Sequence, residues 1–356
     1  MKSLIIFLLS IILSVKLVQA ETIELKQECG IKFPSNLVYS NRVYYLHDTF
    51  KNQILLIDTS GSLINKIESG RAVNYYHSND DFTKIGEKPY GNILSLMKDD
   101  LRNEVFMNIS VHNYKVDSIE NKINIYKPLV CALIDKDGIK DIYDFNMPPE
   151  YISGMYQVKY GNNFAYESSR RYEGSCYLST RELGYADYDC CTTLDNLDLI
   201  QCGLSVDELL NYSPKKDFHM AGRFTAFNDS AFVYFVYPDL LPIKVYFNSV
   251  GNKKFKHDEI NQLIDNGYAI QRIVSNDGKI GIVMVKATKD EPPEFVHKNI
   301  FYLEYNGFDL TFLNKIEIDV EYYNISNFYD FIFVDDELQC LIKTHTKKWK
   351  IINLEF

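Results

Sequence analysis

The chain has 356 residues, a formal net charge of −10 and 46% apolar residues. The acidic balance argues against a nucleic-acid-binding protein, which needs a basic face, and the apolar share excludes a disordered chain. A chain of this length can bury a large core. Because the sequence contains no low-complexity linker, we expect one compact domain.

Residues 1–20 have the pattern of a secretory signal peptide. An early lysine supplies positive charge, residues 4–15 form an apolar run, and Val18-Gln19-Ala20 provides the small-residue cleavage pattern. The apolar run is short for a membrane span, so a retained anchor is the less favoured alternative. We therefore expect a secreted or periplasmic mature chain, residues 21–356, with a net charge of −12 and no stable membrane insertion.

Strand signals dominate the rest of the chain. Short runs rich in aromatic and β-branched residues alternate with turn dipeptides such as Ser60-Gly61 and Asp277-Gly278. Six units of this kind span 41–67, 104–145, 162–193, 230–255, 279–318 and 336–356. The rhythm predicts an all-β fold, a β-propeller of six blades. The alternating segment Thr22–Lys26 is expected to pair with the last unit, so that N- and C-terminal strands close the ring.

Two short helices are expected between the units. Ser205–Asn211 has a serine cap and early acidic residues, and His257–Asn266 ends before a glycine. With so few helical signals, we expect a β-dominated circular-dichroism spectrum, with less helix than the typical third of residues.

The segment 43–64 resembles the NHL-type repeat of β-propeller proteins. The matching residues are Val43, Tyr44, Asp48, Asn52, Ile54, Asp58 and Gly61, with one extra residue between Tyr44 and Asp48. Asp58 and Gly61 suit the backbone of a tight turn, and Asp48 and Asn52 are expected to hydrogen-bond the bend between strands. The resemblance implies a six-bladed propeller like those that many bacteria secrete. The alternative is that the match arises by chance in another all-β array.

The seven cysteines predict one disulfide-bonded cluster and several buried thiols. In an oxidising compartment, neighbouring cysteines favour disulfides, and at least one is expected within the set Cys176, Cys190, Cys191 and Cys202, with its connectivity left open. Cys131 and Cys340 lie in apolar strand patterns and are expected to be buried thiols, whereas Cys29 is ambiguous. The sequence contains no CxxC pair and no histidine at ligand spacing, so a zinc site is not favoured.

No motif for catalysis is present. The sequence lacks a GxSxG elbow, an HExxH helix, a P-loop, a GxGxxG fingerprint and an EF-hand loop. The family resemblance implies one enzymatic alternative, a lactonase or esterase with a metal held at the central channel by acids and asparagines from several blades, but no specific ligand set stands out. No cofactor is predicted. An acidic stretch offers Ca²⁺ ligands at Asp187, Asp189, Asp195 and Asp198, although a solvated loop is the favoured interpretation.

The region 151–212 interrupts the blade rhythm and is interpreted as an irregular insertion rich in tyrosine and cysteine. Tyrosine and arginine often anchor protein interfaces, so a candidate binding surface comprises Tyr166, Arg170, Arg171, Tyr172, Arg181 and Tyr185. The alternative is that these residues pack one irregular blade. Glycosylation sequons at Asn108, Asn211, Asn228 and Asn324 matter only in a host that uses them.

These observations favour a binding or interaction protein whose partner is a protein or a carbohydrate. The propeller hydrolase is the alternative, and a structural component of the cell envelope is a third hypothesis. Convergent carboxylates at a channel mouth would favour the enzyme, and exposed aromatic and basic side chains on one rim would favour binding.

Overall fold

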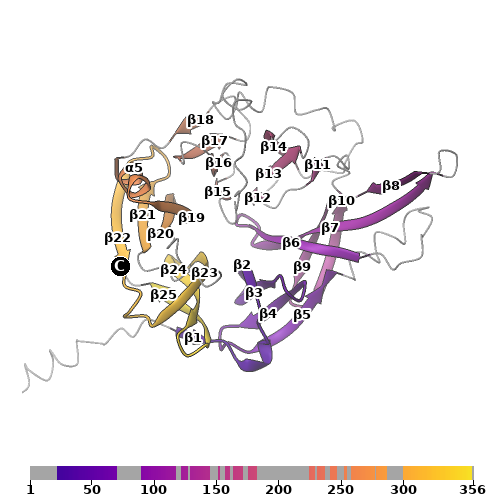
Figure 1. The fold of residues 1–356 in the computed structure, drawn as a ribbon, viewed down its shortest axis with the longest axis horizontal. Helices are drawn as coiled ribbons and strands as arrows, with labels where there is room; N and C mark the ends of the chain where they lie inside the picture. Colours follow the sequence, from indigo (N-terminus) through magenta and orange to yellow (C-terminus); the bar gives the residue numbers. More distant parts are fainter. Residues whose placement is uncertain are drawn as a thin grey trace, which may run out of the picture.

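The computed structural model describes residues 22–69, 90–117, 122–126, 129–144, 151–152, 157–160, 163–170, 175–182, 224–228, 231–236, 241–246, 252–254, 258–276, 278–286 and 300–354. Within these ranges the protein is built from antiparallel sheets arranged around a central axis, the architecture of a β-propeller (Figure 1). The prediction of an all-β propeller is therefore confirmed. No helix in the described part of the chain is long and apolar enough to cross a membrane.

Four of the sheets have four strands each. The first contains β2 (Pro34–Ser40), β3 (Val43–Asp48), β4 (Gln53–Asp58) and β5 (Leu63–Glu68). The second contains β15 (Phe224–Asn228), β16 (Ala231–Val236), β17 (Leu241–Tyr246) and β18 (Asn252–Lys254). The third contains β19 (Tyr268–Asn276), β20 (Lys279–Lys286), β21 (Ile300–Asn306) and β22 (Phe312–Ile318). The fourth contains β23 (Ile325–Val334), β24 (Glu337–Thr344), β25 (Trp349–Leu354) and β1 (Thr22–Glu24).

The remaining sheet has nine strands. It contains β6 (Tyr90–Asp99), β7 (Glu104–Asp117), β8 (Lys122–Tyr126), β9 (Leu129–Asp135), β10 (Gly138–Asp144), β11 (Tyr151–Ile152), β12 (Gln157–Tyr160), β13 (Asn163–Arg170) and β14 (Ser175–Glu182). The prediction of six blades is therefore not matched by the strand pairing of the described residues, which shows four separate four-stranded blades and this larger sheet. Its two halves, β6–β10 and β11–β14, are joined by one parallel residue pair, Lys159 with Asp99.

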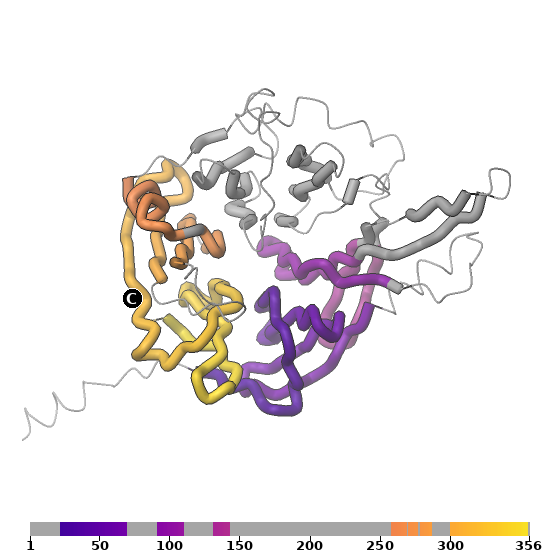
Figure 2. Tube along the Cα trace, in the orientation of Figure 1, coloured from indigo at the N-terminus to yellow at the C-terminus, as the bar shows by residue number. Residues whose placement is uncertain are grey.

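One strand of each sheet, or of each half of the larger sheet, lies towards the ring interior (Figure 1). Successive inner strands contact one another in the order β2, β6, β12, β15, β19 and β23, and β23 contacts β2 again, which closes the cycle (Figure 1). In the tube of Figure 2 the N-terminal sheet, in indigo, accordingly lies beside the C-terminal sheet, in yellow. The apolar core lies between consecutive sheets. One cluster joins the first sheet to β6–β10 through residues such as Tyr45, Leu56 and Met107, and another joins the last sheet to the first through Leu37, Tyr44 and Ile351. Because both faces of the strands are covered in this way, β3 is buried along its whole length.

Ring closure by the chain termini is confirmed. Strand β1 pairs antiparallel with β25, so that Thr22 lies opposite Ile352 and Glu24 opposite Lys350. Beyond β1, the N–H of Lys26 donates to the carbonyl oxygen of Gly61 in the first sheet, 3.0 Å away. The N-terminal segment thus contacts both the last sheet and the first.

The turn of the NHL-like segment behaves as predicted, whereas its bend does not. Asp58 Oδ1 accepts hydrogen bonds from the N–H groups of Ser60 and Ser62, and Gly61 adopts a φ of 80°. Asp48 and Asn52, however, reach away from the bend. Asp48 accepts from the N–H groups that precede β2, while Asn52 Nδ2 donates to the Gly91 carbonyl oxygen at 2.7 Å and Asn52 Oδ1 accepts from the N–H of Ile93. These side chains therefore stabilise contacts between segments.

The second helix prediction is confirmed by α5 (Asp258–Asp265), whereas Ser205–Asn211 lies outside the described residues. Cys131 and Cys340 are buried thiols, as predicted, and Cys29 is a third. Cys190, Cys191 and Cys202 lie outside the described residues, and only the backbone of Cys176 is described, in β14. The structure therefore gives the predicted disulfide no support.

The predicted units are offset from the sheets by one strand. Residues 41, 279 and 336, where three of the units begin, lie after the inner strands β2, β19 and β23 respectively. The segments 34–40 and 325–334 were thus missed as the first strands of their sheets. Both are irregular, since each contains a β-bulge in its pairing with the next strand, and a bulge disrupts the alternation on which strand prediction relies.

Candidate functional site

The turns that follow the inner strands form the best-defined polar surface in the described part of the chain. Asn41 and Arg42 join β2 to β3 with φ angles of 51° and 62°, and Asp335 and Asp336 join β23 to β24 with φ angles of 47° and 67°. A two-residue connection with both φ values positive is the type I′ geometry, which matches the twist of the strands and which Asn and Asp tolerate. All four turn residues are exposed.

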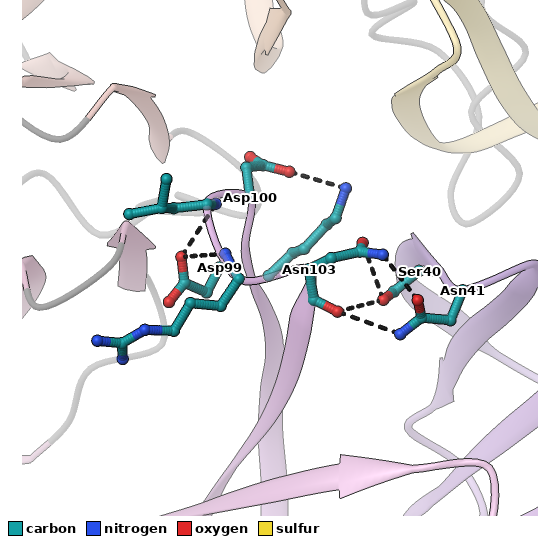
Figure 3. A network of polar contacts seen from close by, with 8 residues as sticks. Ser40, Asn41, Asp99, Asp100 and Asn103 are labelled. Atoms are coloured by element: carbon teal, nitrogen blue, oxygen red, sulfur yellow. Dashed lines mark hydrogen bonds and ion pairs between the residues drawn. The ribbon is translucent and has the colours of Figure 1, made fainter.

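A hydrogen-bond network links the first of these turns to the turn between β6 and β7 (Figure 3). Ser40 Oγ lies 2.6 Å from the carbonyl oxygen of Asn103 and 3.0 Å from its Oδ1. Asn103 Nδ2 donates to Asn41 Oδ1 at 2.9 Å, and Asn41 Nδ2 donates back to the Asn103 carbonyl oxygen at 3.3 Å. Asn103 itself has a φ of 54°. One hydroxyl, two side-chain amides and one backbone carbonyl, contributed by two sheets, therefore hold each other in one arrangement.

The turn between β6 and β7 is also stabilised by contacts among its own residues. The carboxylate of Asp99, fully buried, accepts from the N–H groups of Leu101 and Arg102, and Asp100 forms an ion pair with Lys98 at 2.8 Å (Figure 3). Leu101 remains 58% exposed. The polar groups of Ser40, Asn41 and Asn103 are thus occupied in hydrogen bonds that hold the turns. The side chain of Leu101 and those of its neighbours are left exposed to solvent.

A second link joins the end of β19 to the turn that follows β23. Asn276 Nδ2, at the end of β19, donates to Asp336 Oδ1 after β23 at 2.5 Å. Between the last sheet and the first, burial raises the pKa of the Tyr39 hydroxyl; the nearby carboxylate of Asp335 raises it further, and Arg42 opposes both effects. Acidic, amide and guanidinium groups thus gather where the inner strands end, and we call these segments the inner-turn rim: residues 40–42, 99–103, 276, 278 and 335–336.

The strands that contain Tyr166, Arg170 and Arg181 follow a strand whose backbone lies beside this rim. The single pair between Lys159 and Asp99 places β12 next to the end of β6, and β12 continues through a short connection into β13. In the β13–β14 ladder, Asn163 pairs with Glu182 and Phe164 pairs with Arg181. The backbone of Arg181 therefore lies at the rim end of this hairpin.

The other predicted surface residues are only partly placed. Tyr166 pairs with Ser179, and Arg170 pairs with Ser175 at the opposite end of the same ladder. Arg171, Tyr172 and Tyr185 lie outside the described residues, as do the four acidic candidates for Ca²⁺. Two of the predicted glycosylation sequons differ in exposure. Asn108 is fully buried and donates to Ser95 Oγ, whereas Asn324 is exposed.

Sequence reasoning missed the rim because most of its turns lack the usual turn dipeptides. Asn41-Arg42 and Asp335-Asp336 contain no glycine, and only Asp277-Gly278 was recognised as a turn. The available signal was a pair of Asn or Asp residues between two apolar runs, since these residues adopt positive φ more readily than others.

The rim chemistry suits binding through hydrogen bonds and charge. Within the described residues, no group of three or more His, Cys, Asp or Glu side chains is placed to hold a metal ion. A Ser–His pair does occur in the first sheet, where Ser35 Oγ lies 2.9 Å from His47 Nδ1. His47 is almost fully buried, and this burial lowers the pKa of its imidazole to about 4, although Asp48 acts in the opposite direction. An imidazole this weakly basic is a poor general base at neutral pH.

His47 predicts a specific dependence of stability on pH. Its folded pKa of about 4 lies below the ordinary 6.5, so the stabilisation is fully present above pH 6.5 and is lost as the pH falls from 6.5 towards 4. We expect the free energy of unfolding to drop by about 2 kcal/mol between pH 7 and pH 5 on account of this residue. Urea unfolding at the two pH values should show the drop in wild type and in the exposed-site control His345→Gln, and a smaller drop in His47→Gln. An unchanged drop in His47→Gln would contradict the assignment.

Comparisons with known proteins identify the fold and no family. No family model matches the chain, and no curated protein matches its sequence. Among solved structures, a candidate exported protein from Bacteroides fragilis is 8% identical with a TM-score of 0.50, over 95% of each chain.

Two further solved structures match less closely in shape. A member of the DUF4221 family from Bacteroides vulgatus is 11% identical with a TM-score of 0.44, over 94% of this chain and 97% of that one. The PQQ-bound aldose sugar dehydrogenase from Streptomyces coelicolor is 9% identical with a TM-score of 0.43, over 95% and 98%. At these identities the likeness concerns the fold alone, and the resemblance of residues 43–64 to the NHL-type repeat is not confirmed as membership of that family.

Proposed function

We propose that this chain is an exported β-propeller that binds a protein or carbohydrate partner at the end of the ring that carries the inner-turn rim. The observation that carries the proposal is the pair between Lys159 and Asp99, which sets the tyrosine- and arginine-rich hairpin β13–β14 beside turns already held by hydrogen bonds between sheets. A surface fixed before binding loses less entropy when a partner docks.

The proposed architecture has six blades. Two features support counting the nine-stranded sheet as two blades: its halves share one residue pair, and the inner strands β2, β6, β12, β15, β19 and β23 contact each other in a closed cycle. The Asp58–Gly61 turn supports a relation of the first blade to NHL-type repeats, because its aspartate and glycine take the positions that such a hairpin requires.

The proposed location is outside the cytoplasm. The signal-peptide pattern of residues 1–20 supports export, and the solved structure from Bacteroides fragilis is itself a candidate exported protein. In such a compartment the proposed cluster Cys176, Cys190, Cys191 and Cys202 would form at least one disulfide and stiffen the segment 151–212.

The proposed binding surface is tested by removing its side chains. Replacing Arg171 and Tyr172 by alanine is expected to weaken partner capture by more than about tenfold, since arginine and tyrosine are frequent interface anchors, while the melting temperature stays unchanged. The immobilised mature chain would be used to capture a partner from the source cells, and the affinity of the identified partner would then be measured against both the double variant and the control Leu313→Ala, an exposed residue of β22.

Three outcomes separate the hypotheses. Weaker binding by the double variant alone supports the proposed surface. Equal binding by all variants leaves a binding protein whose surface lies elsewhere. Turnover of lactone or ester substrates that depends on an added divalent metal, with no captured partner, would replace the proposal by the hydrolase.

A further inference from the structure

Two phenylalanines of the first sheet stand in solvent on loops that touch. Phe33 precedes β2 and is 63% exposed, and Phe50 lies between β3 and β4 and is 75% exposed. The loops meet at Thr49, whose N–H and Oγ1 both lie 2.9 Å from the carbonyl oxygen of Phe33. Leaving two large apolar rings in water at neighbouring positions forgoes the gain of burying them, about 25 cal/mol per Å², and so marks an interaction surface.

The backbone beneath the two rings is held firmly. The buried carboxylate of Asp48 accepts the N–H groups of Lys32 at 3.1 Å and Phe33 at 3.0 Å. On the other loop, Asn52 takes a φ of 51° and its side chain hydrogen-bonds Gly91 and Ile93 of the neighbouring sheet. The rings are therefore presented by a rigid frame, the arrangement that makes an exposed aromatic an effective anchor.

Each phenylalanine has an adjacent lysine. Lys32 and Lys51 are both exposed, and Lys51 Nζ donates to the carbonyl oxygen of Gly30 at 2.8 Å, which holds its charge beside the patch. Glu28 is an exposed acid on the same N-terminal segment. In a chain with a net charge of −10, the pairing of both exposed rings with lysine creates a local apolar and basic surface, which we call the Phe33–Phe50 patch: Lys32, Phe33, Phe50 and Lys51.

We propose that the Phe33–Phe50 patch docks a peptide segment of a partner protein in which an apolar anchor is flanked by carboxylates. The inference rests on the proposed binding function and names a second contact surface for it. The rings match an apolar anchor, and the two exposed ammonium groups match the flanking acids in charge. A membrane surface fits less well, because lipid recognition usually requires clusters of 4–8 basic residues. A glycan fits less well because the four side chains of the patch offer only two ammonium donors and no acceptor for sugar hydroxyl groups.

The test uses peptides rather than an unidentified partner. A phage-displayed library of random short peptides is selected on the mature chain, and the best peptides are synthesised and titrated. We expect selection of peptides with Leu, Phe or Trp flanked by Asp or Glu, and a loss of affinity of about tenfold or more in the double variant Phe33→Ser, Phe50→Ser. The control Leu313→Ser, at another exposed apolar position, should bind as wild type. Because both phenylalanines are exposed, the melting temperature of the double variant should be unchanged.

A charge swap tests the electrostatic half of the proposal. The variant Lys32→Glu, Lys51→Glu should lose the acidic peptides and bind versions in which lysine replaces the acids. Selected peptides that lack acids, or that bind the phenylalanine double variant as well as wild type, would overturn the patch proposal and leave the proposed function standing. Failure to select any peptide, or binding of phosphatidylglycerol vesicles or arrayed glycans that depends on the two phenylalanines, would also overturn it. The capture experiment with Arg171 and Tyr172 decides the proposed function independently.

Discussion

Replacing Gly61 by alanine is expected to destabilise the protein by about 2–5 kcal/mol. Gly61 has a φ of 80°, and an added Cβ would lie 2.2 Å from the carbonyl oxygen of Glu24 and 3.3 Å from Ile23 Cγ2. Both contacts belong to β1, the strand that closes the ring, so the methyl group would push that strand away from the first sheet. Urea unfolding followed by the fluorescence of Trp349, the single tryptophan, reports on β25, the strand that pairs with β1.

Gly267 provides the matched control for this substitution. Its φ of 85° imposes the same backbone strain on alanine, but no atom lies within 4 Å of the added Cβ. Gly267→Ala should therefore cost only about 1 kcal/mol. The difference in unfolding free energy between the two variants measures the cost of the steric contact between the added methyl group and β1. Equal losses would show that Gly61 matters for its backbone conformation alone.

Replacing Asp330 by alanine is expected to cost about 3–5 kcal/mol, because it leaves a nearly buried positive charge without its partner. Asp330 joins three inner strands: its Oδ2 accepts the N–H of Leu37 in β2 at 2.7 Å, and its Oδ1 lies 3.1 Å from Arg272 Nε in β19. The Arg272 contact is an ion pair without the alignment of a hydrogen bond. Burial raises the pKa of the Asp330 carboxyl, and Arg272 and the backbone N–H groups of Leu37 and Phe331 oppose that rise.

The double variant Asp330→Ala, Arg272→Met tests whether the unpaired charge is the cause. Removing both charges should restore part of the loss, because only the N–H groups that Asp330 accepted remain unsatisfied, at about 1–3 kcal/mol. Denaturant unfolding of the wild type, both single variants and the double variant gives the coupling energy directly. A double variant as unstable as Asp330→Ala alone would show that the aspartate acts through its backbone hydrogen bonds rather than through the ion pair.

Strand pairs with a strong local signal were predictable from the sequence. The hairpin from Val43 to Asp58 has continuous apolar strands, and the turn at Gly61 follows from an aspartate and a glycine at the required positions. The closing strand was recognised from its alternation, and α5 from its terminal glycine. In each case the residues that determine the structure lie within one turn or one strand pair, where side-chain period and backbone preference act directly.

The inner strands and their contacts were not predictable in the same way. Bulges interrupt β2 and β23, so their alternation is broken where the turn signals also fail. The roles of Asp48, Asn52 and Asp330 were missed or misplaced because each side chain bonds a backbone group outside its own turn. A sequence pattern contains the preference of aspartate for accepting N–H groups but not the identity of the strand that will supply them.

By itself, the sequence determined the all-β architecture, the buried thiols at Cys131 and Cys340, and the closure of the ring by β1, because each depends on local period and on apolar surface that must be covered. The tertiary structure alone decided the order of the inner strands, the joining of β6 to β12 and the hydrogen bonds of the inner-turn rim. Those features arise when sheets pack side by side, so that Leu37 meets Asp330 across 293 positions of the chain. Such contacts depend on how the whole ring closes, which no short stretch of residues specifies.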